Sequence, residues 1–474
     1  MGAERWDFVV AGSGAGGAAA AARLVSGGAR VLLVEEGPVA RPAGDAFEAV
    51  QRYYSDGGLR AALGDGLLPI PTGRTVGGTT TINSGTCLRT PADALARWEA
   101  ASDGAFSATA FGRLVEDAWR ALKAKTAPPE TMTASSRLFL KGLGRLGIPG
   151  GHNLDRAEDG CVGSGLCCFV CPKDAKMTSF KAFLAGLEGN ARFELRSGTA
   201  LVDVEAGTGG VRARLRGGGE IRAEGLVLAC GTMATPYFVR KFRLGPDWRG
   251  AGAGLSVHPA AKVFAEFDEE VEGWKGVPQG AGVVDPEDPA IRYEGVYVPP
   301  EMSAMTVPLE GRGLKRWMDA KPRVATFGFM IRDESRGRVD HPLGAAHPVA
   351  RYRMSPRDYA RMVRGARFTA RALLAAGARR VLLPFNIEAN EASDERSLAA
   401  LPLESAGPAA LQMMAFHPLG TCGLGRVAGW DQSAGPGVTI ADGSVVPESL
   451  GVNPQVTIAA FGLRAAESLL GVRA

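Results

Sequence analysis

The clearest pattern of apolar and polar positions lies in residues 6–38, WDFVVAGSGAGGAAAAARLVSGGARVLLVEEGP. A short apolar run is followed by a Gly-rich turn, an Ala-rich stretch, and a second apolar run that ends on acidic residues. Short apolar runs bounded by glycine favour strands, and a longer Ala-rich stretch favours a helix. The pattern therefore predicts a strand, a helix and a second strand, which together form a βαβ unit.

Two later segments also alternate between strand and helix patterns. Residues 350–383 predict a strand, a long helix opened by Ser355 and Pro356, and another strand. Residues 438–470 predict a strand, a turn and a helix, with Asn453 as the N-cap and Pro454 at the first helical position. The start of this last helix would direct its free backbone N–H groups toward a ligand.

The turn of the predicted βαβ unit carries a dinucleotide-binding motif. Gly12, Gly14 and Gly17 satisfy G-x-G-x-x-G, in which the glycines permit a tight turn, a close approach of the backbone to pyrophosphate, and close packing of helix on strand. Glu35 ends the second strand, where an acid accepts hydrogen bonds from the adenosine ribose. The alternative, a purely structural Gly-rich turn, fits the strand, helix, strand and acid less well, so we predict a bound dinucleotide.

Composition narrows the class of protein without naming a substrate. The chain has 474 residues, 46% of them hydrophobic, and a net charge of only +4, with no basic stripe of the kind that nucleic acid requires. The opening apolar run is rich in Gly and Ala and follows no basic segment, so it predicts neither a membrane span nor a secretory signal. Seven cysteines, an odd number, favour a reducing compartment, and we expect a cytoplasmic protein.

Further motifs extend the pattern to both ends of the chain. They are GRTVGGTTTIN at residues 73–83, CGTMATP at 230–236, SVHP at 256–259, and a C-terminal series of HPLGTC, ADGSVVP and NPQVT. Together with GSGAGG at the start, these motifs resemble the glucose-methanol-choline (GMC) oxidoreductases in identity and in order. Members of that family bind FAD, and the resemblance covers nearly the whole chain.

The resemblance implies a mixed α/β fold in two domains. A Rossmann-like FAD-binding domain would take residues 1–265 and 415–474, and a substrate domain built on an antiparallel sheet would take residues 266–414. Gly77, Gly78, Thr79 and Asn83 would line the pyrophosphate and the flavin. The remaining implied contacts are those of Leu201 with the adenine, Asp442 and Gly443 with the ribityl or phosphate region, and residues 453–457, including Pro454 and Gln455, with the pyrimidine side of the flavin.

The same resemblance implies the chemistry. His417 would take the hydroxyl proton of an alcohol, sugar or sterol-like substrate while hydride leaves for flavin N5, and Asn453 would hold the substrate oxygen. Oxygen, a quinone or a cytochrome would accept the electrons. Ile82 stands where covalently flavinylated members have a histidine, which predicts non-covalent FAD. A flavin-bound lyase or decarboxylase, as in other branches of the family, is the alternative, and His258 is expected to be structural.

Four cysteines fall within residues 161–171, and Cys161, Cys167 and Cys171 follow C-x5-C-x3-C-P. Three thiolates suit a 3Fe–4S cluster. The spacing is similar to that of iron–sulfur-bearing FAD sugar dehydrogenases, which pass electrons to a cytochrome and whose partner subunit can carry an export signal. It is also similar to a loop of long-chain alcohol oxidases for which no cluster is implied. A cluster, a packed loop and a local disulfide all remain open.

Overall fold

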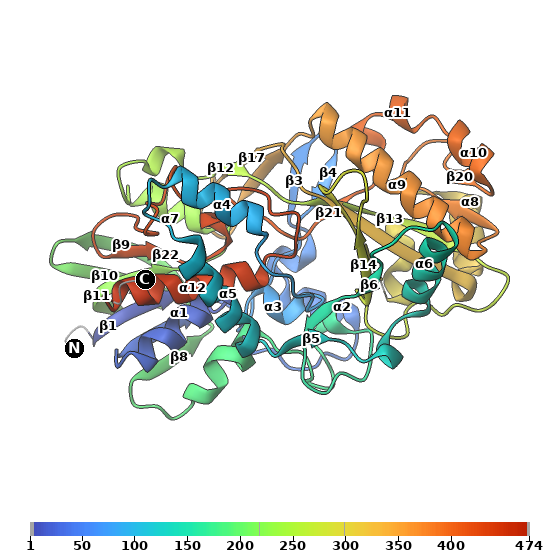
Figure 1. Ribbon diagram of the computed structural model, residues 1–474. Helices are drawn as coiled ribbons and strands as arrows, with labels where there is room; N and C mark the ends of the chain where they lie inside the picture. Colours follow the sequence, from blue (N-terminus) through green and yellow to red (C-terminus); the bar gives the residue numbers. More distant parts are fainter. Residues whose placement is uncertain (1–3, 218, 298, 472–474) are drawn as a thin grey trace.

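The computed structural model describes residues 4–217, 219–297 and 299–471. Figure 1 shows two halves side by side, one around the sheet that contains β1 and the other around the sheet that contains β13. The first and the last described elements, β1 and α12, both lie in the first half. The predicted βαβ unit is confirmed as β1 (Glu4–Ala11), α1 (Ala15–Ser26) and β2 (Val31–Glu35), because the two apolar runs are buried and pair in parallel.

The first sheet has seven strands in the order β8-β2-β1-β11-β10-β9, with β22 beside β11. Strands β8, β2, β1, β11 and β22 are parallel, and β9 and β10 continue the sheet antiparallel. The bounds of the strands not yet given are Phe193–Ser197 (β8), Leu201–Gly207 (β9), Gly210–Leu215 (β10), Glu220–Leu228 (β11) and Val438–Ile440 (β22).

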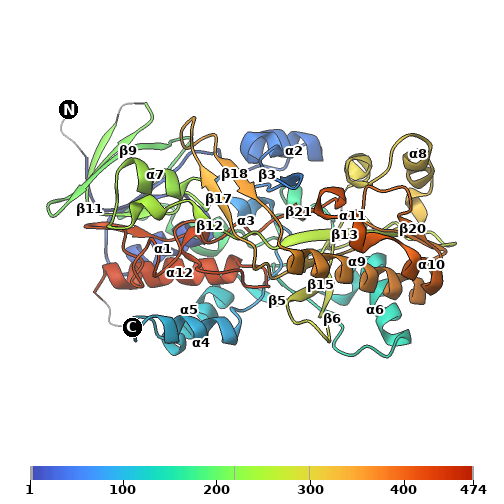
Figure 2. The ribbon, with the colours of Figure 1, turned by 90° about the horizontal axis from the view of Figure 1, so that it is seen from above.

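Two helices from opposite ends of the chain pack together on the first sheet. Helix α12 (Gln455–Leu469) lies against α1, and a Cβ atom on Gly462 would come within 2.1 Å of the Gly16 carbonyl oxygen. Helix α5 (Ala108–Ala121) covers α12, with the rings of Phe111 and Phe461 4.5 Å apart. Small residues thus let the C-terminal helix join the N-terminal βαβ unit, as Figure 2 shows from above.

The second sheet has eight strands in the order β20-β19-β13-β16-β15-β14-β6, with β21 beside β13, and every pairing in it is antiparallel. Helices α6 (Ala134–Arg145) and α9 (Pro356–Ala376) cover one face. The strands are His152–Asn153 (β6), Pro259–Glu266 (β13), Ala281–Val284 (β14), Ile291–Gly295 (β15), Val324–Ile331 (β16), Arg380–Leu382 (β19), Glu391–Ala392 (β20) and Met414–Ala415 (β21).

A third sheet of five strands, in the order β12-β17-β18-β3-β4, lies between the halves, and a two-stranded sheet pairs β5 with β7. Their bounds are Ala253–Leu255 (β12), Gly337–Asp340 (β17), Val349–Tyr352 (β18), Ala61–Gly64 (β3), Leu67–Pro69 (β4), Ala124–Thr126 (β5) and Asp155–Ala157 (β7). The other α-helices are Ala46–Tyr53 (α2), Thr79–Ile82 (α3), Ala92–Ala101 (α4), Thr235–Lys241 (α7), Gly311–Asp319 (α8), Glu395–Ala400 (α10) and Leu403–Ala406 (α11).

The predicted mixed α/β fold with an antiparallel second sheet is confirmed, and the structure adds two details. The long helix begins at Pro356 with the Ser355 side chain as its cap, as predicted, but its flanking strands β18 and β19 belong to different sheets. The predicted domain boundary after residue 265 falls inside β13. In the described ranges, no helix combines the length and apolar character that spanning a bilayer requires.

Candidate active site

The Gly-rich turn between β1 and α1 leaves open space at one of its three glycines. A Cβ atom on Gly12 would lie 2.2 Å from the Ala229 carbonyl oxygen, and one on Gly17 would lie 2.0 Å from the Gly12 carbonyl oxygen, so both glycines are needed for packing. Gly14 has an ordinary φ of −63°, and a Cβ atom there would meet no protein atom within 4 Å. The room in front of the helix N-terminus is of the kind that a phosphate group occupies.

Glu35 at the end of β2 ties this turn to a second Gly-rich loop. The buried Glu35 carboxylate accepts hydrogen bonds from the Ser13 backbone N–H (3.1 Å), the Ser13 hydroxyl (2.7 Å) and the Gly37 N–H (2.8 Å). The Ser13 hydroxyl in turn accepts from the Gly77 N–H at 2.9 Å. Burial raises the pKa of Glu35, because its charged form loses water.

The second loop lies directly against the first. Gly77 and Gly78 have φ values of 90° and 54°, and a Cβ atom on Gly78 would come within 2.9 Å of the Gly14 Cα. Thr79 opens α3, and its hydroxyl accepts from the Gly73 N–H. The Asn83 side chain then donates to the Gln455 side-chain oxygen at 2.8 Å, which links this loop to the start of α12. The structure thus brings together residues that the sequence analysis assigned to one cofactor.

Three further predicted cofactor residues, Asp442, Gly443 and Leu201, flank these loops. Asp442 is buried, and its carboxylate accepts from the N–H groups of Gly231 (2.9 Å) and Ser444 (2.8 Å). Burial raises the pKa of Asp442. Gly443 directly follows Asp442. Leu201 is also buried and begins β9. It lies near the end of β2, because the Thr199 N–H donates to the Glu35 carbonyl oxygen. Asp442 therefore joins the segment after β11 to the C-terminal segment.

The predicted catalytic pair meets between the two large sheets. His417 Nε2 lies 3.4 Å from Asn453 Nδ2. The imidazole is enclosed by protein yet partly accessible, as expected for a side chain that lines a cleft, and burial lowers its pKa to about 4. Among the described residues, His417 Nδ1 and Asn453 Oδ1 are buried without a hydrogen-bond partner. His417 is therefore neutral at neutral pH and can accept a proton.

The prediction that Asn453 caps the last helix is wrong. Helix α12 begins at Gln455, one residue later than predicted, because Pro454 has φ −89° and ψ 0° and stands outside the regular helix. The Asn453 side chain makes no capping hydrogen bond and turns instead toward His417 and toward Glu294. Its tertiary neighbours thus outweigh the local preference of asparagine for a cap.

His258 supports the catalytic pair from behind, as the sequence analysis expected of a structural residue. Its Nε2 accepts from the backbone N–H groups of Leu450 (2.9 Å) and Gly451 (2.7 Å), and its ring centre lies 5.2 Å from that of His417. Burial lowers the pKa of His258, so it accepts these bonds as a neutral ring. The Asp333 carboxylate accepts hydrogen bonds from the backbone N–H of His258 and from the Ser449 hydroxyl. These bonds fix the loop that leads to Asn453.

Glu294 is a component of the site that the sequence analysis missed. It lies on β15, it is buried, and its Oε2 accepts from Asn453 Nδ2 (3.3 Å) and Gln279 Nε2 (3.2 Å). Burial raises the pKa of Glu294. Gln279 continues the network to the Thr86 hydroxyl at 2.6 Å. In the sequence, Arg292 and Glu294 alternate with apolar residues, a pattern that also describes the solvent face of a strand, so no local signal marks Glu294.

The three spaced cysteines line one small pocket together with Arg156, Glu158 and Lys176. Cys167 is buried and its Sγ accepts from Arg156 Nη2 at 3.2 Å. In the part of the chain that the structure describes, no group of three or more His, Cys, Asp or Glu side chains is arranged to hold a metal ion. The geometry of Cys161, Cys167 and Cys171 thus lends no support to an iron–sulfur cluster, which stays a prediction.

Lys176 joins this cysteine loop to the second Gly-rich loop. Its buried ammonium donates to the carbonyl oxygens of Thr81 (2.7 Å), Asn83 (2.8 Å) and Cys167 (2.7 Å). Burial lowers the pKa of Lys176 to about 8. The cysteine loop therefore braces the backbone of Asn83, whose side chain contacts Gln455.

Comparison with known proteins agrees with this arrangement. Two family models, both described as GMC oxidoreductase, match residues 50–260 and 333–462. A GMC-type oxidoreductase of Mycobacterium tuberculosis (strain H37Rv) is 35% identical over 99% of this chain and 77% of its own length. The chain belongs to the GMC oxidoreductase family. A long-chain-alcohol oxidase of Arabidopsis thaliana is a more distant relative, 24% identical over 95% of this chain and 66% of its own.

Solved structures of other GMC-fold enzymes share the fold. Pyridoxine 4-oxidase from Mesorbium loti has a TM-score of 0.73 at 17% identity and covers 98% of this chain and 99% of its own. A formate oxidase has a TM-score of 0.71 at 16% identity and covers 99% and 98%. A fungal aryl-alcohol oxidase has a TM-score of 0.67 at 15% identity and covers 98% and 99%. GMC oxidoreductases depend on FAD. In this member, the two Gly-rich loops are the candidate site for that cofactor.

Proposed function

We propose that this GMC oxidoreductase binds FAD non-covalently and oxidises the CH–OH group of an alcohol. The observation that carries the proposal is the neutral His417 imidazole beside Asn453, with one buried polar atom on each side chain that lacks a partner among the described residues. Such atoms are costly unless a ligand satisfies them. A substrate hydroxyl supplies both a donor and an acceptor.

The residues around the two Gly-rich loops fit FAD. The open space at Gly14 suits a pyrophosphate, the Glu35 carboxylate keeps one further lone pair for a ribose, and Ile82 offers no covalent attachment. Gly77, Gly78, Thr79 and Asn83 would contact the pyrophosphate and the flavin, with Gln455 on the pyrimidine side. Bound FAD supplies an acceptor for the hydride that leaves the substrate carbon.

In this mechanism the protein moves one proton and holds one oxygen atom. His417 accepts the hydroxyl proton, for which its low pKa keeps a lone pair available. Asn453 donates one N–H to Glu294, which holds its amide plane. Its Nδ2 also lies 3.4 Å from His417 Nε2, so a substrate oxygen bonded to the second N–H would take the place of that contact. Glu294 and His258 therefore orient Asn453 and His417, which preserves the geometry that proton transfer requires.

An alcohol substrate is favoured by the relatives, which include long-chain-alcohol oxidases and, among solved structures, an aryl-alcohol oxidase. The proposal includes the electron acceptor, which would be oxygen, a quinone or a cytochrome. The alternative, a flavin-bound lyase or decarboxylase, would use the same cofactor site without net oxidation of an alcohol.

Anaerobic mixing of the purified flavoprotein with a panel of alcohols tests the proposal. We expect the flavin absorbance to bleach with at least one alcohol, and His417→Ala to slow this reduction about a hundredfold while it keeps its flavin. Because the pKa of His417 is lowered to about 4, the wild-type reduction rate should be flat near neutral pH and fall only as pH drops toward that value. Failure of every alcohol to bleach the flavin, or a wild-type rate in His417→Ala, would refute the assignment.

A further inference from the structure

The face of the antiparallel sheet opposite α6 and α9 is covered only in part, by α8, whose Trp317 packs with Phe264 of β13. Ala261, Val263 and Ala265 of β13 point into the core beneath α9. Side chains alternate along a strand, so Lys262 and Phe264 point to the opposite face. Glu294, which contacts Asn453, occupies that same face on β15. The face therefore borders the catalytic pair.

Lys262 stands on this face without an acceptor for its ammonium among the described residues, because it takes part in neither a hydrogen bond nor an ion pair of a described side chain. Its side chain is partly accessible, yet burial lowers its pKa to about 7. Both properties hold for a side chain inside a cleft. Its Nζ lies 5.4 Å from the centre of the Phe264 ring, so the amine leans along the strand toward that ring.

The register places Lys262 in one cross-strand row with Glu294. Lys262 pairs with Gly328 on β16, and Gly328 pairs with Glu294 on β15. Neighbouring strands lie about 4.8 Å apart, so the two outer residues are roughly 10 Å apart at their Cα atoms. Gly328 has no side chain of its own, and the side chain of Val296 lies over it, since a Cβ atom on Gly328 would come within 2.8 Å of Val296 Cγ1. A molecule that touches Asn453 beside Glu294 would therefore reach Lys262 across the apolar side chain of Val296.

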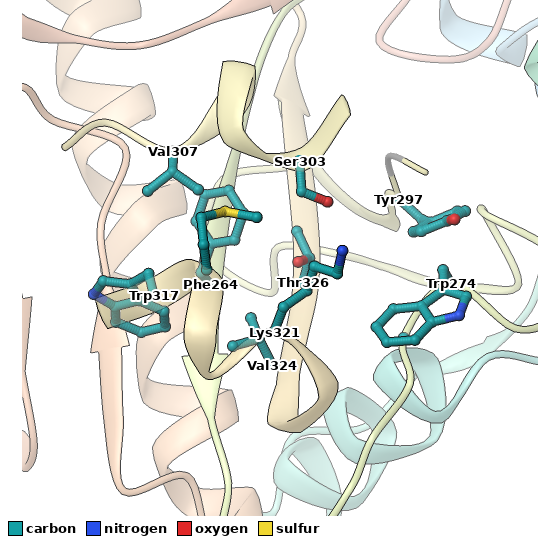
Figure 3. Close-up of a pocket in the computed structure, with 11 residues that line it drawn as sticks. Phe264, Trp274, Tyr297, Ser303, Val307, Trp317, Lys321, Val324 and Thr326 are labelled. Carbon is teal, nitrogen blue, oxygen red and sulfur yellow. The ribbon is translucent and has the colours of Figure 1, made fainter. Parts of the chain in front are cut away.

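An aromatic pocket lies on the other side of Lys262. Phe264 and Thr326, the next row along the sheet, form part of its wall. Figure 3 shows Trp274 and Tyr297 on one side of the pocket and Trp317 on the other. The amine of Lys321, which also lines the pocket, donates to the Pro300 carbonyl oxygen. The pocket suits an apolar carbon skeleton, and Lys262 stands between it and the catalytic pair.

We propose that Lys262 binds the carboxylate of the substrate, so that the enzyme acts on apolar alcohols that carry one acid group. This inference rests on the proposed function and names the substrate class for it. A carboxylate supplies the acceptor that Lys262 lacks, and a charge-assisted hydrogen bond in a cleft is stronger than one between neutral groups. The CH–OH group would lie at His417 and Asn453, about two strands away, and the aromatic pocket would receive apolar parts of the skeleton.

Matched pairs of acid and ester test this class. The pairs are para-hydroxymethylbenzoate and an omega-hydroxy fatty acid, each with its methyl ester, and the measurement is the second-order rate constant of anaerobic flavin reduction. We expect the wild type to prefer the acid of at least one pair by about tenfold to a hundredfold, as a hydrogen bond to a charged group provides. Lys262→Met should abolish the preference and Lys262→Arg should keep part of it. Lys315→Met, on the exposed side of α8, is the matched control and should leave it unchanged.

A binding experiment separates this inference from the proposed function. Benzoate and its neutral analogue benzamide lack a reactive hydroxyl, and their binding is followed by the change in the spectrum of oxidised flavin. We expect benzoate to bind the wild type more tightly, and this advantage to disappear in Lys262→Met and in Lys262→Gln, each first shown to retain FAD. The inference is overturned if the wild type reacts equally fast with acid and ester and binds benzoate and benzamide equally tightly, even if alcohols reduce the flavin. The inference is also overturned if the Lys262 variants keep the wild-type preference for the acid and for benzoate, and only the reoxidation of their flavin by oxygen is slower.

Discussion

Replacing Lys176 by methionine tests whether the cysteine loop supports the cofactor site. Methionine keeps the length and much of the apolar volume of lysine but donates no hydrogen bond. The three carbonyl groups of Thr81, Asn83 and Cys167 would then lose the donor that Lys176 provides at 2.7 to 2.8 Å. Two of them belong to the segment whose Asn83 side chain meets Gln455, so the loss falls on the predicted flavin contacts.

The size of the effect follows from two opposing contributions. A buried carbonyl left without a partner costs about 1 to 3 kcal/mol, so three of them cost roughly 3 to 9 kcal/mol. Removing the ammonium recovers part of this cost, because burial lowers its pKa from 10.5 to about 8, and 1.36 kcal/mol per pKa unit makes that part about 3 kcal/mol. We therefore expect a net loss of about 3 kcal/mol. If this whole loss falls on the cofactor loop, FAD binding weakens by somewhat more than about a hundredfold.

The assay is titration of the apoprotein with FAD, together with thermal melting of the holoprotein followed by flavin fluorescence. Lys173→Met is the control, since Lys173 is an exposed lysine of the same loop. The sign of the pH effect gives a second check. Because the pKa of Lys176 is lower in the folded state, the unfolded state binds more protons between about pH 8 and 10.5, and wild-type stability gains from this group as pH rises through that window. If Lys176→Met binds FAD and melts like the wild type, the bracing role is wrong.

Three further outcomes are expected. Gly14→Val should fold with an unchanged melting temperature of the apoprotein, since its Cβ meets no protein atom, but bind FAD at least about a hundredfold more weakly; normal FAD affinity would disprove the phosphate site. Glu294→Leu should slow flavin reduction by about tenfold or more, while Glu294→Gln, which still contacts Asn453, should slow it less; equal rates in the two variants would rule out the orienting role. Cys167→Ser should retain FAD, and if Cys161, Cys167 and Cys171 hold the predicted cluster, anaerobically purified wild type should contain iron and acid-labile sulfide that Cys167→Ser loses; wild type free of both would refute the cluster.

The sequence alone determined the features that depend on neighbours along the chain. The βαβ unit follows from two apolar runs around an Ala-rich stretch, and the start of α9 follows from Ser355 and Pro356. The roles of Gly12 and Gly17 were also predictable, because a motif with a defined backbone path leaves no room for a Cβ atom at those positions. His417 and Asn453 were found through the resemblance of their motifs to a family.

Only the tertiary structure decided what lies around those residues. Asn453 looked like a helix cap, yet contacts with Glu294 and His417, which lie 159 and 36 residues away in the chain, set its orientation. Glu294 and Lys262 occupy alternating strand positions that a solvent-facing strand would show as well, so their placement on the face opposite α6 and α9 depended on which face those helices cover. Periodicity along a strand distinguishes its two faces but does not say which of them meets water, because that is settled by packing between segments far apart in the sequence.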